Sequence, residues 1–305
     1  MKILLAIDSS ADSEAVVREA ASRPWPSGAV FCAVTVVDMR SLEDIPTLIE
    51  DAKHEAEKLV MSAAETLVTN AAGALRQSGC DVSSKILQGE PKTAIQDFAA
   101  KWGANLILIG ARGLSSLERF LLGSVAQAVL RTAPCSVEVV RRPPFPASHP
   151  GEGLKILLGT DGSEFSSKAA YSVANRPWPP GSQVRIISVQ ELLVPEAVAA
   201  SSLQYSIYSE GSMKEVSGVT RKRAEDAVEQ ARSILGSGHL AICDTPQDVP
   251  VGDPRTFLVD EAKSWEADLI VVGSHGRRGF DELLLGSVSE SVAMHANCSV
   301  EVIRG

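Results

Sequence analysis

The sequence predicts an α/β fold that is built twice: two tandem doubly wound domains, each an open, mostly parallel five-stranded sheet with helices on both faces. Three observations predict it. Short apolar runs alternate with longer segments that have helical spacing. Runs such as LILIG and LIVVG are apolar at nearly every position, which is typical of parallel strands covered on both faces. The two halves of the chain also repeat one another.

The repeat is visible without gaps at the start of each half. MKILLAIDSSADSEAVVREAASRPWPSG (1–28) aligns with LKILLGTDGSEFSSKAAYSVANRPWPPG (154–181), and the halves end in CSVEVVRR and CSVEVIRG. The proline-rich stretch RRPPFPASHPGEG (141–153) suits an extended connector. With roughly 100 to 200 residues expected per domain, we predict one domain over residues 1–147 and a second over 148–305.

Each element follows from its local pattern. The apolar runs predict strands in the first copy at 3–7, 31–37, 82–87, 105–110 and 136–140, with matching runs in the second copy at 155–159, 184–189, 269–273 and 299–303. Residues 50–79 have the spacing of a long amphipathic helix. The last strands, SVEVV and SVEVI, would be exposed apolar sheet edges, so we expect them to pair and join the copies as an internal pseudo-dimer, with further homodimerisation an open possibility.

The second copy is not a plain duplicate of the first. The segment between Val189 and Gly252 is ten residues longer than the one between Val36 and Gly89. We place the insertion at roughly residues 192–215. Because it follows the carboxyl end of a strand, we expect a mobile lid or a partner-binding segment near the second site.

Composition excludes several classes of protein. The formal net charge is −9, with −2 in residues 1–150 and −7 in residues 151–305, which disfavours binding to nucleic acid. No apolar run is long enough to span a membrane, and the five cysteines form no CxxC pair. His54, His149, His239 and His295 have no partners at metal-ligand spacing. We expect a cytoplasmic protein with no membrane, nucleic-acid or metal-cluster function.

A glycine pattern occurs once in each copy. LIGARGLSSLERFLLGSV (108–125) and VVGSHGRRGFDELLLGSV (271–288) both end a strand in glycine, add a second glycine three residues later, and open the final helix with Gly-Ser. The strand-end glycines allow close backbone approach or a positive φ. Free amides at a helix N-terminus, reinforced by the helix dipole, bind phosphate well. No GK[ST] follows, so this is not a Walker A loop, and the glycines follow the fourth strand, unlike those of dinucleotide-binding domains.

Asp8 and Asp161 end the first strand of each copy. Two roles are open for them: capping the helix that follows, or accepting hydrogen bonds from a ribose or an adenine amino group at the carboxyl end of the strand.

The motif G-x2-G-x9-G-[ST] after an apolar strand, together with the strand-end aspartate and the CSVEVV-type last strand, resembles the universal stress protein family over nearly the whole chain, twice. The resemblance implies ATP binding, with or without Mg²⁺. The adenine and ribose side would comprise Ala6, Asp8 and Val36 in the first copy and Gly159, Asp161 and Val189 in the second. The phosphate side would comprise Gly110, Arg112, Gly113, Gly123, Ser124 and Val125, and in the second copy Gly273, His275, Gly276, Gly286, Ser287, Val288 and Ser289.

The first site departs from the pattern. Ala126 stands where the second copy has Ser289, whose hydroxyl can meet phosphate, and Arg112 stands where the second copy has His275. We therefore expect the first site to bind ATP more weakly, although an arginine can supply positive charge to a phosphate.

We expect a nucleotide-dependent regulator in stress response that hydrolyses ATP slowly or not at all, and not an enzyme. Two alternatives remain. The first is a scaffold of the same fold that binds no nucleotide, because some family members lack the motif. The second is an adenylate-forming enzyme, which would need a phosphate-binding segment of the type SGGxDS where this chain has DSSADS and DGSEFS.

Overall fold

A computed structural model describes residues 1–40, 50–113, 122–141, 153–191, 210–236, 238, 240–243, 249–277 and 285–305. The first half contains β1 (Lys2–Ala6), α1 (Ala11–Ser22), β2 (Val30–Val37), α3 (Glu50–Gln77), β3 (Asp81–Gln88), α4 (Pro91–Trp102), β4 (Leu106–Gly110), α5 (Ser124–Thr132) and β5 (Ser136–Val140). The second contains β6 (Lys155–Gly159), α6 (Glu164–Asn175), β7 (Gln183–Ile187), α8 (Glu210–Leu235), β8 (Ala241–Cys243), α9 (Pro254–Ser264), β9 (Leu269–Gly273), α10 (Ser287–His295) and β10 (Ser299–Ile303).

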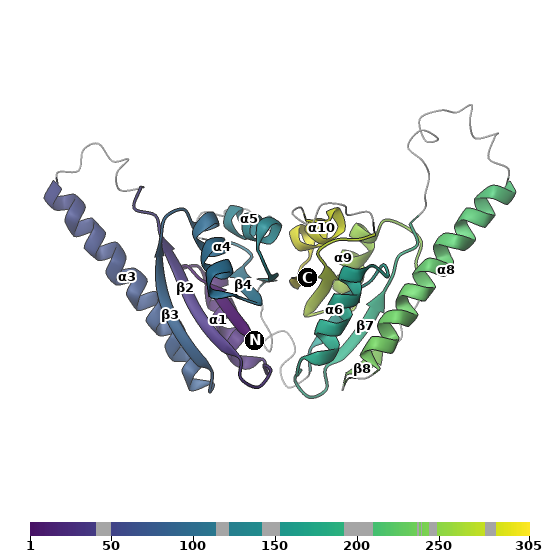
Figure 1. The fold of residues 1–305 in the computed structure, drawn as a ribbon, viewed down its shortest axis with the longest axis horizontal. Coiled ribbons are helices and arrows are strands. Elements are labelled where there is room, and N and C mark those ends of the chain that lie inside the picture. Colours follow the sequence, from purple (N-terminus) through teal and green to yellow (C-terminus); the bar gives the residue numbers. More distant parts are fainter. Residues whose placement is uncertain are drawn as a thin grey trace, which may run out of the picture.

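The described strands form one ten-stranded sheet in the order β3-β2-β1-β4-β5-β10-β9-β6-β7-β8. Pairing is parallel throughout each half and antiparallel only where β5 meets β10. Figure 1 shows the halves side by side, with the long helices α3 and α8 on the outer flanks. The predicted α/β class with two tandem doubly wound domains is confirmed, and the five strands of each domain join into one continuous sheet.

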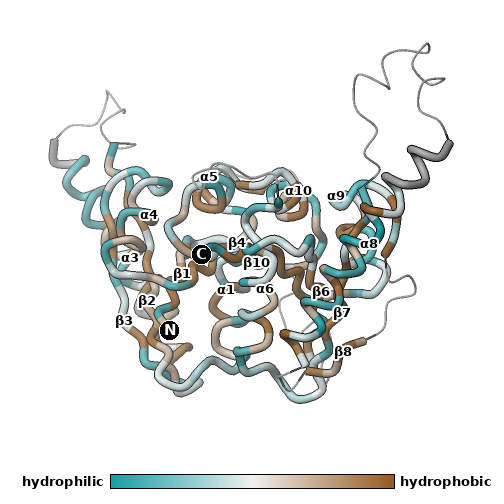
Figure 2. The backbone as a smooth tube through the Cα atoms, turned by 45° about the vertical axis from the view of Figure 1, so that its right-hand side comes forward, coloured by the Kyte–Doolittle hydropathy of each residue, from teal (hydrophilic) through white to brown (hydrophobic). Residues whose placement is uncertain are grey.

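Helices cover both faces of this sheet. On one face, α1 and α3 pack over the first half and α6 and α8 over the second, each pair closing its own apolar core. On the other face, α4, α5, α9 and α10 cover a single apolar core that continues across the junction between the halves. The strands form the apolar layer between these helices (Figure 2). Because both faces are covered, the apolar runs that predicted parallel strands are explained.

The predicted pairing of the last strands is confirmed. Val139 lies opposite Val300 and Val137 lies opposite Val302, so neither strand remains an exposed edge. Between these pairs Glu138 faces Glu301, and both glutamates are fully buried. Each accepts hydrogen bonds from an arginine at the end of a helix, Arg23 after α1 and Arg176 after α6.

Two further arginines cross the junction reciprocally. At the end of β5, Arg141 donates to the carbonyl oxygens of Ala293 and Met294 in α10, and Arg304 after β10 donates to those of Leu130 and Arg131 in α5. Each guanidinium satisfies carbonyls in the last turn of the other half's helix, where positive charge is favoured. Burial lowers the pKa of Arg141 to about 10. The two halves are therefore joined by backbone pairing, a shared apolar core and exchanged helix caps.

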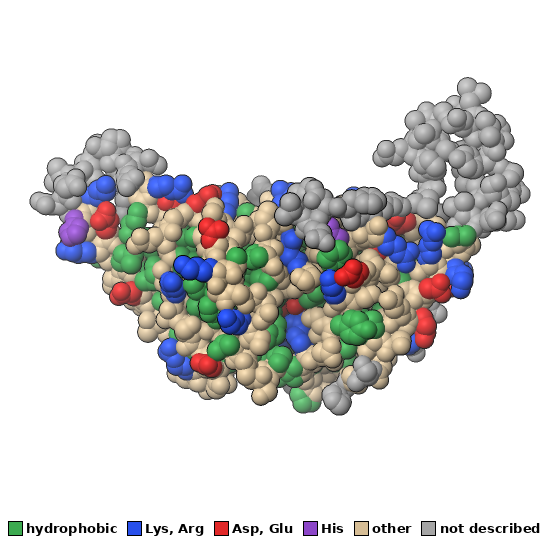
Figure 3. All heavy atoms as spheres, in the orientation of Figure 1, with side chains coloured by type: hydrophobic (Ala, Val, Ile, Leu, Met, Phe, Trp, Pro, Cys, Tyr) green, Lys and Arg blue, Asp and Glu red, His purple; other side chains and the backbone are tan. Residues whose placement is uncertain are grey.

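The predicted domain boundary near residue 148 and most of the predicted insertion lie outside the described residues. Helix α8 begins at residue 210 and so includes the end of the insertion. Among the helices of the described residues, none combines the length and apolar character that crossing a bilayer requires. Acidic and basic side chains are interspersed over the face shown in Figure 3.

Candidate functional site

The second half contains a cavity of about 530 Å³ at the carboxyl ends of its strands. Its floor comes from the ends of β6, β7 and β9, and its walls come from α8, the start of α9 and the start of α10. All ten residues predicted for the second site line it: Gly159, Asp161, Val189, Gly273, His275, Gly276, Gly286, Ser287, Val288 and Ser289. The carboxyl edge of an open parallel sheet is where ligands bind in this architecture.

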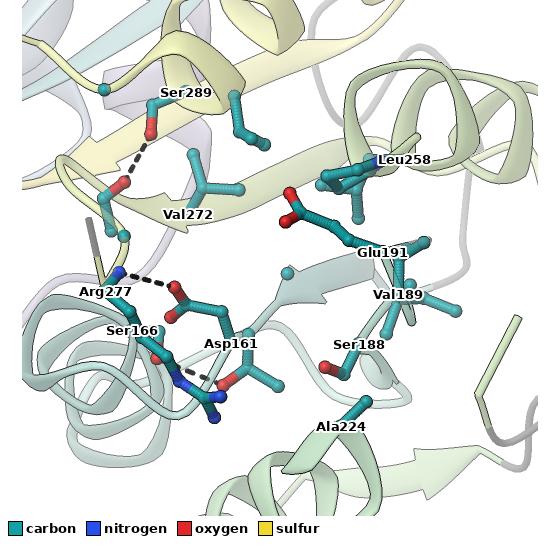
Figure 4. A pocket seen from close by; sticks show the side chains of 18 of the residues that line it. Asp161, Ser166, Ser188, Val189, Glu191, Ala224, Leu258, Val272, Arg277 and Ser289 are labelled. Carbon is teal, nitrogen blue, oxygen red and sulfur yellow. Dashed lines mark hydrogen bonds between the residues drawn. The ribbon is translucent and has the colours of Figure 1, made fainter. Parts of the chain in front are cut away.

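Asp161 ties the turn after β6 to the glycine loop. One carboxylate oxygen accepts the backbone amide of Ser163 at 2.9 Å, and the other accepts the backbone amide of Arg277 at 3.0 Å. A Cβ at Gly276 would lie 2.8 Å from that second oxygen, so only glycine allows the carboxylate to approach so closely. Figure 4 shows Asp161 pointing toward the loop, with Arg277 beside it.

The aspartates do not cap the helices themselves. Ser163 is the N-cap of α6 and accepts the amide of Ser166, and Ser10 caps α1 in the same way. Asp8 accepts the amide of Ser10 at 2.9 Å, so each aspartate supports the turn that presents the capping serine. The helix-capping role left open by the sequence therefore belongs to the serines.

Close approach, rather than positive φ, explains the glycines at the strand ends. A Cβ at Gly273 would lie 2.6 Å from the carbonyl carbon of Phe165, and one at Gly110 would lie 3.0 Å from the Cβ of Asp12. Neither glycine is among the described residues with a left-handed backbone. The glycines therefore let the first turn of α6, or of α1, pack directly on the strand end. Of the two roles that the sequence allowed for these glycines, close approach is the one that the structure shows.

Gly286 and Gly123 are the N-cap residues of α10 and α5, with φ of −66° and −62°. The amide of Gly286 donates to the carbonyl oxygen of Ser274 at 2.8 Å, which fixes the start of α10 against the strand-end loop. The first three amides of α10, at Ser287, Val288 and Ser289, have no acceptor inside the helix and lie on the cavity wall.

The hydroxyl of Ser289 is already engaged. It is buried and donates to the carbonyl oxygen of Gly273 at 2.6 Å, which fastens α10 to the end of β9 (Figure 4). A phosphate would have to compete for the only proton of this hydroxyl.

The phosphate side differs between the copies. Arg112 in the first copy forms an ion pair with the buried Asp12, with 3.1 Å between Nε and Oδ2, and the Arg112 backbone amide donates to the same oxygen. In the second copy Phe165 takes the place of Asp12, and the buried ring of His275 packs on it with 5.0 Å between ring centroids. Nδ1 of His275 lies 3.1 Å from the Ser274 hydroxyl.

The first site follows the same plan in its described part. Ala6, Asp8, Val36 and Gly110 lie at or near the carboxyl ends of β1, β2 and β4, and the hydroxyl of Ser10 donates to the carbonyl oxygen of Arg112 at 3.3 Å. A Cβ at Gly113 would lie 2.8 Å from Asp8 Oδ2, as at the matching glycine of the second copy. Ser124 and Val125 start α5. Residues 114–121 lie outside the described residues.

Two of the cavity residues that the sequence analysis does not single out are arginines, Arg223 and Arg277. The side chain of Arg223 is exposed, as a charged run predicts, and it also borders the cavity. Ala224, the residue after Arg223, is apolar and buried. This apolar position next to the charged run is the signal in the sequence for the face of α8 that turns toward the sheet.

The five cysteines are all free thiols, and burial raises the pKa of Cys135 and of Cys298 to about 12. Thiols with such pKa values are protonated at neutral pH, which fits structural residues and not nucleophiles. No group of three or more histidine, cysteine or acidic side chains within the described ranges is arranged to hold a metal ion.

The fold and the site together define a tandem α/β protein with a glycine loop at the carboxyl edge of each half. A sequence profile of the universal stress protein family matches residues 1–141 and 154–304, so the chain belongs to that family and contains two copies of its domain.

Relatives support this over the whole length. A universal stress protein of Mycolicibacterium smegmatis is 30% identical over 330 residues, covering 99% of this chain and 96% of the relative. One of Mycobacterium tuberculosis is 30% identical over 256 residues, covering 82% of this chain and 77% of the relative. The solved structure of a universal stress protein from Archaeoglobus fulgidus has the same fold, with a TM-score of 0.61 and 20% identity over 99% of this chain and 98% of that one.

Proposed function

We propose that each copy binds one adenine nucleotide, ATP with or without Mg²⁺, and that the protein is a nucleotide-dependent regulator in stress response that hydrolyses ATP slowly or not at all. The observation that carries the proposal is the cavity of about 530 Å³ in the second half, which brings together the strand-end aspartate, the glycine loop and the amide end of α10. Its volume lies within the range of small-molecule sites, about 300 to 1,000 Å³.

The residues fit a nucleotide by chemistry as well as by size. The free amides of Ser287, Val288 and Ser289 would hold phosphate oxygens at the positive end of the α10 dipole. Asp161 and Val189 would lie on the adenine and ribose side. Both oxygens of Asp161 already accept backbone amides, so we assign Mg²⁺ to the phosphate oxygens and not to this carboxylate.

We assign no catalytic residue. The segments DSSADS and DGSEFS form the turns after β1 and β6 and the first turns of α1 and α6, where their serines cap the helices. That role does not favour adenylate formation. We keep a cytoplasmic location and a further homodimer as expectations.

The test is the stoichiometry of ATP binding, measured by calorimetry on the parent protein, Gly123→Val, Gly286→Val and the double variant. We expect two, one, one and no bound nucleotides. A Cβ at Gly286 would lie 3.0 Å from the carbonyl oxygen of Ser274, so valine there should push the loop into the phosphate corner. The substitution Gly73→Val is the matched control, because a Cβ at Gly73 meets nothing within 4 Å.

Circular dichroism of each variant separates loss of binding from loss of fold. If Gly286→Val folds and binds ATP with unchanged stoichiometry and affinity, the glycines only form a tight turn, and the proposed nucleotide site of the second copy is wrong. A folded parent that binds no ATP would leave the scaffold alternative in its place.

A further inference from the structure

The second cavity is lined by two arginines that the first copy lacks. Arg223 comes from α8 and Arg277 from the loop after β9. At the matching positions the first copy has Ala63 and Leu114. The second half has the larger net negative charge, so these two positive side chains have the opposite sign to the net charge of their own domain.

The helix match rests on burial. Ala64, Val68, Ala71 and Leu75 are buried in α3, and Ala224, Val228, Ala231 and Leu235 are buried in α8 with the same spacing. The two helices therefore turn equivalent faces toward their sheets. The residue before Ala64 is Ala63, and the residue at the equivalent position before Ala224 is Arg223.

The side chain of Arg277 crosses from the glycine loop to α8. Its backbone amide is held by Asp161, and its Nη2 atom lies 3.5 Å from the carbonyl oxygen of Arg223. On the way it passes over Gly162, where a Cβ would lie 2.7 Å from Nη2. In Figure 4 the guanidinium points toward Ala224 and away from Ser289. The two arginines therefore lie on the Asp161 side of the cavity, apart from the amide end of α10.

Neither arginine forms an ion pair within the described part of the chain, although the carboxylates of Asp161 and Glu191 line the same cavity. Arg221 pairs with Glu225 at 2.8 Å, and Lys222 pairs with Asp226 at 3.4 Å. No acidic oxygen of the described residues lies within ion-pair distance of the guanidinium of Arg223 or Arg277. In the first copy, by contrast, Arg112 is paired with Asp12.

We infer that the second site takes a nucleotide with two separated anionic groups, one at the amide end of α10 and another, on the ribose 2′ or 3′ oxygen, between Arg223 and Arg277. The inference rests on the proposed function, which places the ribose at Asp161. Arginine beside the residue that contacts a ribose is how a phosphorylated ribose is accommodated in other nucleotide sites. Guanidinium groups form strong, charge-assisted hydrogen bonds with phosphate.

The experiment compares adenosine 5′-monophosphate with adenosine 3′,5′-bisphosphate and adenosine 2′,5′-bisphosphate by calorimetry. The Gly123→Val background restricts binding to the second copy. We expect one of the two bisphosphates to bind about tenfold more tightly than the monophosphate, with an advantage that shrinks as salt is raised. In the double variant Arg223→Ala, Arg277→Leu, which installs the first-copy residues, the affinity ratio should fall to about one.

Arg221→Ala is the matched control, because it removes a neighbouring cation that is already paired, and the ratio should be kept. A ratio near one in the Gly123→Val protein, or a ratio that survives in a folded double variant, would overturn the inference while leaving the proposed function intact. If ATP, the monophosphate and both bisphosphates all fail to bind, the proposed function is wrong and this inference fails with it.

Discussion

Replacing Arg23 by methionine tests how the two halves are joined. The Arg23 side chain is 1% exposed and donates two hydrogen bonds to Glu138, at 3.0 Å and 2.6 Å. A second carboxylate, that of Glu19, lies 3.3 Å from Nη1. Methionine keeps much of the apolar volume and removes the cation, which leaves the buried carboxylate of Glu138 without its hydrogen-bonded partner, while Arg176 is the other positive charge that acts on it.

The size of the effect depends on the junction. Glu138 is fully buried because β10 pairs with β5, and breaking a buried ion pair costs about 3 to 5 kcal/mol. If the halves were not paired in solution, Glu138 would lie on an exposed sheet edge, and losing the pair would cost about 0 to 1 kcal/mol. The two cases differ by more than the error of a denaturation measurement.

The pH dependence has a definite sign. Burial alone would raise the pKa of Glu138, but the charge and hydrogen bonds of Arg23 outweigh it and hold that pKa below 4.5. A lowered pKa contributes stability above the pKa of the unfolded chain, and that contribution is lost as the pH falls through the folded value. The penalty of Arg23→Met should therefore be full at pH 7 and shrink as the medium becomes more acidic than pH 4.5.

The assay is unfolding in guanidinium chloride, followed by tryptophan fluorescence and far-UV circular dichroism. If the two transitions coincide, unfolding is two-state and a single free energy of unfolding describes the protein. Arg18→Met on the exposed face of α1 is the matched control and should cost less than about 0.5 kcal/mol. Adding Glu138→Met should recover much of the loss, because the unpaired charge is gone. An Arg23→Met penalty equal to that of Arg18→Met would refute the buried junction.

Three further substitutions test individual contacts. Asp12→Asn should free the charge of Arg112 and tighten ATP binding at the first site severalfold, measured calorimetrically with the second site silenced; an unchanged affinity would show that this arginine does not reach phosphate. Burial and the nearby carboxylate of Glu138 raise the pKa of Glu19. Glu19→Gln should therefore be more stable than the parent at pH 7, and the difference in unfolding free energy should vanish toward pH 4.5. A difference that does not depend on pH in unfolding measurements would contradict a protonated Glu19. Ser289→Ala should cost about 1 kcal/mol in unfolding free energy and keep the stoichiometry of ATP, because the hydroxyl donates to Gly273; lost binding with unchanged stability would assign its proton to phosphate instead.

The features that the sequence predicted correctly depend on patterns that tertiary structure does not override. The apolar runs and the repeat predicted the strands, because a parallel strand covered on both faces has to be apolar throughout. The edge pairing followed from SVEVV and SVEVI, since two short apolar edges are better buried than exposed. The sequence also shows a glutamate at the centre of each run. It does not show which side chain pairs with that glutamate, because Arg23 and Glu138 are far apart in the chain.

Positions that depend on where one side chain lies relative to another could not be predicted. Arg223 belongs to a charged run, which predicts an exposed side chain. The side chain is exposed, and only the packed helix shows that it also borders the cavity. The sequence allowed close approach or a positive φ for the strand-end glycines, and only the structure shows that they are needed because the first turn of a helix packs against them. Both features depend on contacts between elements that are remote in the sequence.

A repeated sequence predicts two equivalent sites, and three pairs of residues argue that they are not equivalent. Where the first copy has Asp12 and Arg112, the second has Phe165 and His275, so an internal ion pair is replaced by a contact between two tilted rings. Where the first copy has Leu114, the second has an arginine that reaches α8. Positive charge has thus moved from inside the glycine loop, where a carboxylate neutralises it, to the cavity wall, where a ligand can meet it. Because the backbone plan is the same in both copies, differences in ligand preference between them should follow these side chains, and exchanging them should exchange the preference.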